Sequence, residues 1–174
     1  RENPAVGESR IVRGGSYTHD ARNIRAADRH SFVPGTRGVY LGFRVARTSN
    51  SKTTRLSFEW ADIPSGEFQM GNDLRVFHDL ALPNECPSHE ISLAEFCISK
   101  TPVTNAEYEM FVRDTNYLVP AHWIEGDIPQ GKENHPVTNV SWDSAQDFCA
   151  WASVRLLTEA EWEIAARGSG SGEA

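Results

Sequence analysis

The sequence predicts an α+β domain with about three helices, several short strands and much irregular chain. Two observations carry this prediction. Helix-start signals recur in the second half of the chain, and short apolar stretches bounded by turn residues occur along its whole length. The 174 residues fit one ordinary domain, and 39% hydrophobic and 24% charged residues are values typical of globular proteins.

The helices are predicted from their caps. Thr104 precedes Glu107 by three residues, and Thr158 precedes Glu161 by three, each ahead of apolar residues. This spacing is a capping box, in which the hydroxyl accepts from a free backbone N–H and the glutamate reaches back to the cap. Ser141 is expected to cap a third helix. The apolar stripe of that helix is Trp142, Ala145, Cys149 and Ala152.

The strands are predicted from apolar alternation next to turns. Residues 64–66 read as a turn before a strand at 67–70. Residues 11–13 and 43–45 are two more candidates. A further pair of strands around a bend is expected from Ile91, Leu93, Phe96 and Ile98.

The chain divides by composition into four parts: an Arg- and Gly-rich segment at 1–47, a linker at 48–57, a main segment at 58–168 and a flexible tail at 169–174. Residues 1–57 hold ten Arg and one Lys against four acids, a net charge of +7, whereas the remainder carries −14. The arginines are spread out and not clustered, so we expect the two parts to attract each other and do not expect nucleic-acid binding.

The cysteines favour free thiols. Cys86, Cys97 and Cys149 are odd in number and widely spaced, which is untypical of a disulfide framework. Buried free thiols are therefore favoured over a single disulfide. No secretory signal or membrane-spanning run is found in the sequence, so a cytoplasmic, prokaryotic protein without a membrane partner is the favoured interpretation.

Common catalytic and metal motifs are absent from the sequence. It contains neither a phosphate-binding loop nor a Gly-x-Ser-x-Gly elbow. Cys86 and His89 form half of a possible zinc motif, but no further ligands stand at zinc spacing, so a structural histidine is favoured. Glu159, Glu161 and Glu163 are interpreted as a helix face and cap.

Several motifs together resemble the formylglycine-generating-enzyme, or sulfatase-modifying-factor, family. Those resembling the family's N-terminal part lie at residues 63–71, 85–89, 101–108, 135–142, 157–163 and 165–168. Those resembling its C-terminal part are Arg13-Gly14-Gly15-Ser16, Arg25-Ala26-Ala27, Arg29 and Gly42-Phe43-Arg44. The resemblance implies a C-type-lectin-like fold with little regular structure.

The order of these segments departs from the family's. The C-terminal-type segment comes first, which implies either a circular permutation or the junction of two tandem family domains. The family's middle segment, with its Asn-x-Trp-Glu-Trp stretch where relatives place calcium ligands, is missing here. No calcium site is therefore carried over, and no cofactor is expected.

The chemistry that the resemblance implies also departs from the family's. The family enzyme resembles a copper-dependent oxidase that uses a cysteine pair just after Arg-Gly-Gly-Ser, since thiolates bind Cu(I) and exchange with a substrate cysteine. Here residues 17–24 contain no cysteine. We therefore expect a non-catalytic domain. A cysteine-oxidising relative and a vestigial structural domain stay open as alternatives.

The positions between the framework residues are the candidate binding surface. The segment resembles the variable region of diversity-generating-retroelement proteins, and its mixture of Tyr, His, Arg and Asn is typical of binding surfaces. Arg25, Arg29, Arg37 and Arg44 are expected to be held by carboxylates or backbone carbonyls. The partner is expected to be a protein or a small ligand, and a domain-swapped homodimer is a further possibility. The candidate residues are Tyr17, Thr18, His19, Asp20, Arg22, Asn23, His30, Phe32 and Tyr40.

Overall fold

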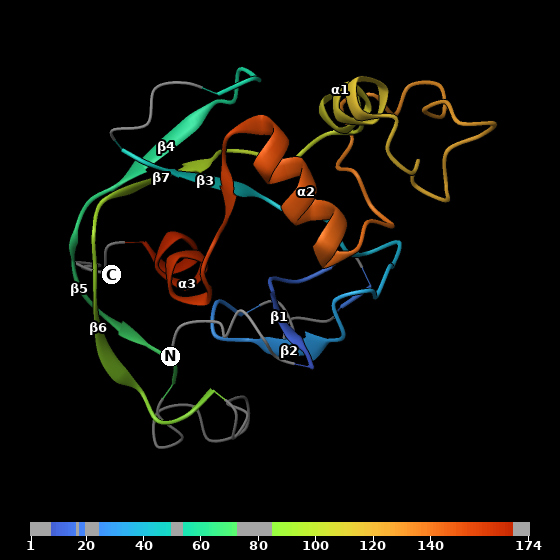
Figure 1. The fold of residues 1–174 in the computed structure, drawn as a ribbon. Coiled ribbons are helices and arrows are strands. Elements are labelled where there is room, and N and C mark those ends of the chain that lie inside the picture. The colour runs from blue at the N-terminus through green and yellow to red at the C-terminus, as the bar shows by residue number, and fades with distance from the viewer. Residues whose placement is uncertain (1–7, 17, 20–24, 50–53, 73–84, 169–174) are drawn as a thin grey trace. The chain divides into compact units, whose positions relative to one another are not determined.

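The computed structural model describes residues 8–16, 18–19, 25–49, 54–72 and 85–168. In this part of the chain, three α-helices and eight short strands form an α+β structure with three small sheets (Figure 1), which confirms the predicted class. The described residues fall into two compact units. One draws on residues 1–33, 63–95 and 157–174, and the other on 34–62 and 96–156.

The first unit contains two antiparallel hairpin pairs and one helix. Strand β1 (Arg10–Arg13) pairs with β2 (Arg29–Phe32), and helix α3 (Glu159–Arg167) contacts β1. Strand β5 (Gly66–Met70) pairs with β6 (His89–Leu93), and the two run side by side in Figure 1. The sequence predicted β1, β5 and β6. It missed β2, whose residues Arg-His-Ser-Phe show no apolar alternation.

The second unit is a sheet with two helices. The strand order is β4-β7-β3-β8. The helices are α1 (Asn105–Thr115) and α2 (Trp142–Ala152), which contact each other. The strands are β3 (Val45–Thr48), β4 (Trp60–Ile63), β7 (Phe96–Ser99) and β8 (Arg155–Leu156).

One predicted strand was placed two residues too early. Residues 43–45 were expected to form a strand, but β3 begins at Val45. Phe43 instead packs against the aromatic core, and Arg44 donates to the Ser99 carbonyl oxygen. The ladder to β7 and β8 occupies Val45–Thr48, because partners from distant parts of the chain lie opposite these residues.

The helix starts are as predicted. Thr104 and Glu107 form a complete capping box, as do Thr158 and Glu161. The Ser141 hydroxyl accepts from the Ser144 N–H at 3.1 Å. No helix in the described residues is long and apolar enough to cross a membrane.

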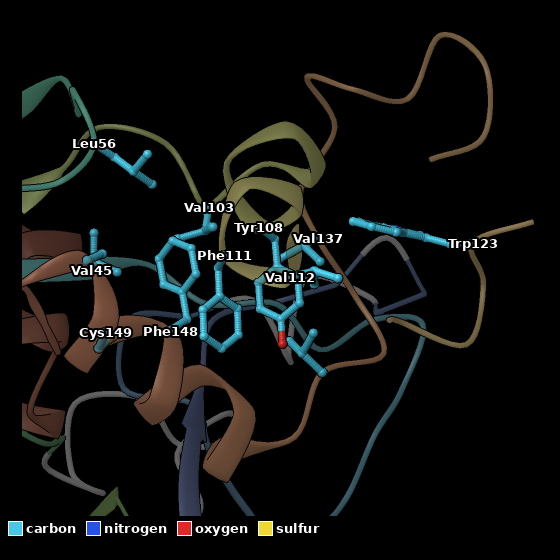
Figure 2. Close-up of a cluster of buried hydrophobic side chains, with 12 residues drawn as sticks. Val45, Leu56, Val103, Tyr108, Phe111, Val112, Trp123, Val137, Phe148 and Cys149 are labelled. Atoms are coloured by element: carbon cyan, nitrogen blue, oxygen red, sulfur yellow. The ribbon is translucent and has the colours of Figure 1, made fainter. Parts of the chain in front are cut away.

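Aromatic residues of the two helices fill the core of the second unit. Tyr108 and Phe111 from α1 and Phe148 from α2 are at most 2% exposed. The Tyr108 ring centroid lies 5.3 Å from that of Phe111 and 5.6 Å from that of Phe148. Figure 2 shows these rings gathered together, with Trp123 set apart on the segment after α1. Burying each ring stabilises the unit by about 1.5–3 kcal/mol.

Early and late segments of the chain meet within each unit. In the first unit Arg13 pairs with Glu159, and in the second Val45 lies opposite Leu156. The predicted attraction between the basic first third and the acidic remainder is thus realised within one chain. The domain-swapped dimer stays a prediction.

Glu163 on α3 is a fully buried acidic residue of the first unit. Its side chain is 0% exposed. Arg167 Nη2 lies 2.8 Å from Glu163 Oε1. Arg13 Nη2 lies 2.9 Å from Glu163 Oε2, but this contact does not have the geometry of a hydrogen bond. The Gly71 N–H donates to Oε1 at 2.7 Å. Gly71 has φ +86°, and an added Cβ would lie 2.6 Å from the Glu85 carbonyl oxygen, so only glycine fits this approach.

Glu159, one turn earlier on α3, accepts from two arginines. Arg13 Nε donates to Oε1 at 3.0 Å, and Arg29 Nη2 donates to Oε2 at 3.1 Å. Burial disfavours ionisation of Glu159. The hydrogen bond from Arg29 and the charge of Arg13 outweigh burial, so the pKa of Glu159 lies below its ordinary value. The predicted helix face is therefore an arginine-binding face.

We expect Glu163→Gln to lower the free energy of unfolding by on the order of 3 kcal/mol, because it leaves the nearly buried Arg13 with less compensation. Urea unfolding of the full chain measures the loss. The control is Glu109→Gln, which removes the surface pair with Arg113 and should change stability by only about 0.5 kcal/mol. Equal losses in both variants would contradict a special role for Glu163.

We also expect Glu159 to contribute to acid sensitivity. A carboxyl whose folded pKa is lowered stabilises the fold above its unfolded pKa of about 4.3, and this contribution is lost as the pH falls through the folded value. Glu159→Gln should therefore lose less stability than the wild type between about pH 5 and pH 3. Thermal melts across this range measure it, and parallel pH profiles would rule the coupling out.

Candidate functional site

The segment after Arg13-Gly14-Gly15-Ser16 begins as a tight turn in the first unit. Gly14 has φ +84°, and an added Cβ would lie 3.0 Å from the Trp162 ring, so the glycine is required on both counts. The His19 N–H donates to the Ser16 carbonyl oxygen at 2.9 Å, and the Thr18 N–H donates to Ser16 Oγ at 3.2 Å. The turn places Thr18 on the surface and His19 half-buried.

Two histidines and a buried carboxylate lie close together behind this turn. The His19 and His30 ring centroids are 6.0 Å apart. His30 Nε2 lies 3.2 Å from Asp28 Oδ2, with the His30 side chain 43% exposed and the Asp28 side chain fully buried. Neither Asp28 carboxylate oxygen, nor His19 Nδ1, has a hydrogen-bond partner among the described residues. The His30 imidazole and the Asp28 carboxylate are therefore close, without a hydrogen bond between them.

Asp28 was not among the sequence-predicted site residues. The available signal was its position between the framework residues Ala27 and Arg29, just before the strand that carries the candidate His30. The sequence did not reveal that strand.

The framework arginines are held as predicted. Arg25 makes two hydrogen bonds of 2.7 Å to the two oxygens of the fully buried Glu85, and this pairing raises its pKa. Arg29 is hydrogen-bonded to Glu159, which raises its pKa as well.

In the second unit the remaining framework arginines bind backbone oxygens. Arg44 donates to the Ser99 carbonyl oxygen and Arg37 to the Asn139 carbonyl oxygen. Burial lowers the pKa of Arg44. Arg44 is thus held as predicted, whereas Arg37 is exposed and its contacts are 3.4 Å long.

The candidate binding residues fall into three sets. Thr18, His19, His30 and Phe32 lie in the first unit, where Phe32 is half-buried opposite Arg10 of β1. Tyr40 is 46% exposed in the second unit. Tyr17, Asp20, Arg22 and Asn23 lie outside the described residues.

Two exposed apolar side chains of the same stretch were missed. Val33 is 61% and Val39 54% exposed. Each adjoins a candidate residue in sequence, Phe32 and Tyr40 respectively, which was the signal that could have included them. Each is a single exposed apolar side chain, Val33 in the first unit and Val39 in the second.

The three cysteines are free. Cys97 Sγ lies 3.1 Å from Asp62 Oδ1, and Cys149 is buried in the core of the second unit. Burial raises the pKa of the Cys149 thiol to about 12, so its thiolate is disfavoured at neutral pH. Cys86 is only half-buried, which corrects the expectation that all three thiols are buried.

Metal ligation is not organised in the described part of the chain. No group of three or more His, Cys, Asp or Glu residues there is arranged to hold a metal ion. His89 Nδ1 lies 3.1 Å from the Pro87 carbonyl oxygen on the surface. What the turn and the histidine pair can do chemically is to offer hydroxyl and imidazole groups to a ligand.

The chain matches a known family model and several known proteins. A model of the sulfatase-modifying factor enzyme 1-like domain matches residues 1–49 and 51–174. The formylglycine-generating enzyme of Streptomyces coelicolor is 32% identical over 151 aligned positions, covering 63% of this chain and 47% of that protein. The inactive C-alpha-formylglycine-generating enzyme 2 of Bos taurus is 30% identical over 174 positions, covering 76% and 55%.

A differently named relative also matches. Hercynine oxygenase of Mycolicibacterium smegmatis is 31% identical over 129 positions, covering 59% of this chain and 30% of that protein. The chain spans about half the length of the formylglycine-generating enzymes it matches. With a family model matched along both stretches, the chain belongs to the sulfatase-modifying-factor family.

Proposed function

We propose that the chain is a non-catalytic ligand- or protein-binding domain of the sulfatase-modifying-factor family. The observation that carries the proposal is a difference between two sets of residues along one segment. The framework arginines are all engaged by protein oxygens, while Thr18, His30 and Tyr40 between them are exposed. Such a segment keeps its scaffold when the intervening side chains change, which suits a recognition surface.

The absence of thiols supports a non-catalytic role. Residues 17–24, which follow Arg-Gly-Gly-Ser, contain no cysteine, and the three cysteines of the chain lie elsewhere. An imidazole does not replace a thiolate in exchange with a substrate cysteine. Two relatives, from Mus musculus and Bos taurus, carry the word inactive in their names, so the family includes proteins described in that way.

The finer aspects of the family likeness are part of this proposal. They are a C-type-lectin-like fold, a permuted or tandem-junction order of segments, and diversification of the intervening positions. The two separately matched stretches are compatible with such an order. Calcium is not assigned, because the segment that holds it in relatives has no counterpart here.

The second candidate function is oxidation of a cysteine residue by a family enzyme. It is favoured by the names of several relatives, which are formylglycine-generating enzymes. It requires copper-binding thiolates that the turn does not supply. The binding role is therefore preferred.

We expect the chain not to convert cysteine to formylglycine with copper and oxygen. A peptide carrying a sulfatase-type cysteine motif is incubated with the full chain and Cu(I), and mass spectrometry looks for the aldehyde. A family enzyme with its cysteine pair is the positive control. Aldehyde above the level of a protein-free control would establish the enzyme alternative.

We expect exposed and framework positions to differ in their effect on stability. A Thr18→Ala, His30→Ala, Tyr40→Ala triple variant should stay within about 0.5 kcal/mol of wild type per site. Arg25→Ala should cost on the order of 3 kcal/mol, because it leaves the buried Glu85 carboxylate without its bidentate partner. Thermal melts compare the two. Unfolding of the triple variant beside a harmless Arg25→Ala would show that the candidate positions are core.

A further inference from the structure

A pocket of the second unit lies where the sheet ladder ends. Its volume is about 180 Å³, and β3 and the turn into β8 line it. β8 pairs only with Val45 and Ala46, so the following residues of β3 have no ladder partner on that side. The lining residues are Ala46, Arg47, Thr48, Ser153, Val154 and Arg155.

Arg47 has a fixed guanidinium without an acceptor. Its Cζ lies 4.6 Å from the centroid of the Trp60 ring, a cation–π contact. Arg47 Nε is buried and has no hydrogen-bond partner among the described residues. An unmet donor of this kind costs about 1–3 kcal/mol, so stacking alone does not account for the arrangement.

The other described arginines are engaged differently. Each of them donates to an oxygen of the protein, whether a carboxylate, a hydroxyl or a backbone carbonyl; they are Arg10, Arg13, Arg25, Arg29, Arg37, Arg44, Arg55, Arg113, Arg155 and Arg167. Arg47 is the exception in this part of the chain. Its difference points to an acceptor that the protein itself does not provide.

The charge of the pocket is positive. Arg155 lies opposite Ala46 in the ladder and brings a second guanidinium to the lining, where it also donates to the Leu156 carbonyl oxygen at 3.2 Å. No carboxylate is among the lining residues. Ser153 caps the C-terminus of α2, where the helix dipole contributes about half a negative charge. The full positive charge of Arg47 outweighs it.

We propose that this pocket binds the anionic group of a small ligand, a phosphate or a carboxylate. A guanidinium offers paired N–H donors that match both groups, and the Thr48 and Ser153 side chains add hydroxyl donors. A volume of about 180 Å³ leaves room for an anionic group with a short organic substituent. The pocket shares no residue with the proposed recognition surface and stands independently of it.

The test follows amide signals of the isotope-labelled full chain by NMR during titration with inorganic phosphate and, separately, with acetate at constant ionic strength. We expect saturable shifts confined to residues 46–48 and 153–155. Arg47→Gln should weaken the affinity by about tenfold or more, because a charge-assisted pair is lost. Arg47→Lys, which keeps the charge and loses the fork, should fall between. Arg113→Gln, an exposed arginine on α1, should bind like wild type.

The two titrations separate the sources of the anion. Saturation by phosphate assigns a phosphorylated ligand, and saturation by acetate alone assigns a carboxylate. Shifts that do not saturate in the wild type, that chloride reproduces, or that Arg47→Gln leaves unchanged would overturn the proposal. The wild-type titration decides the matter even if a variant fails to fold.

Discussion

The pairing of arginines from the first 47 residues with carboxylates more than fifty residues away is the interaction on which the first unit depends. A hairpin of two four-residue strands is marginal by itself. Arg13 and Arg29 attach it to α3 through Glu159, and Glu163 beneath them is fully buried. Each guanidinium that leaves water must meet an oxygen, so these contacts fix the hairpin on the helix. These contacts therefore also position the turn that carries Thr18 and His19.

The second unit is built instead around apolar and aromatic contacts. Its helices meet through Tyr108, Phe111 and Phe148, whose rings contact one another edge-on and stacked. Dispersion and apolar burial are non-directional, so this core tolerates the irregular chain around it. Its polar features lie at the margins. There Arg44 is satisfied by a backbone oxygen, whereas Arg47 is held by an aromatic face and left without an acceptor among the described residues.

Under the proposed function, the chain keeps the family's fold without its cysteine chemistry. The framework that the family shares is a matter of arginines meeting oxygens, and it is intact here. Oxidation of a cysteine needs thiolates at one turn, and that turn offers a hydroxyl and an imidazole instead. A fold can be kept when a reaction is not, because stability and catalysis depend on different side chains. The proposed binding role uses what the scaffold still displays.

The sequence by itself determined the helix starts, the absence of thiols at residues 17–24 and the family, because caps and motifs are local patterns. It also anticipated the engagement of Arg25, Arg29, Arg37 and Arg44. Only the tertiary structure decided which oxygen each arginine meets and that β3 starts at Val45. These features depend on partners far apart along the chain, and no local pattern encodes which distant group will lie opposite a given residue.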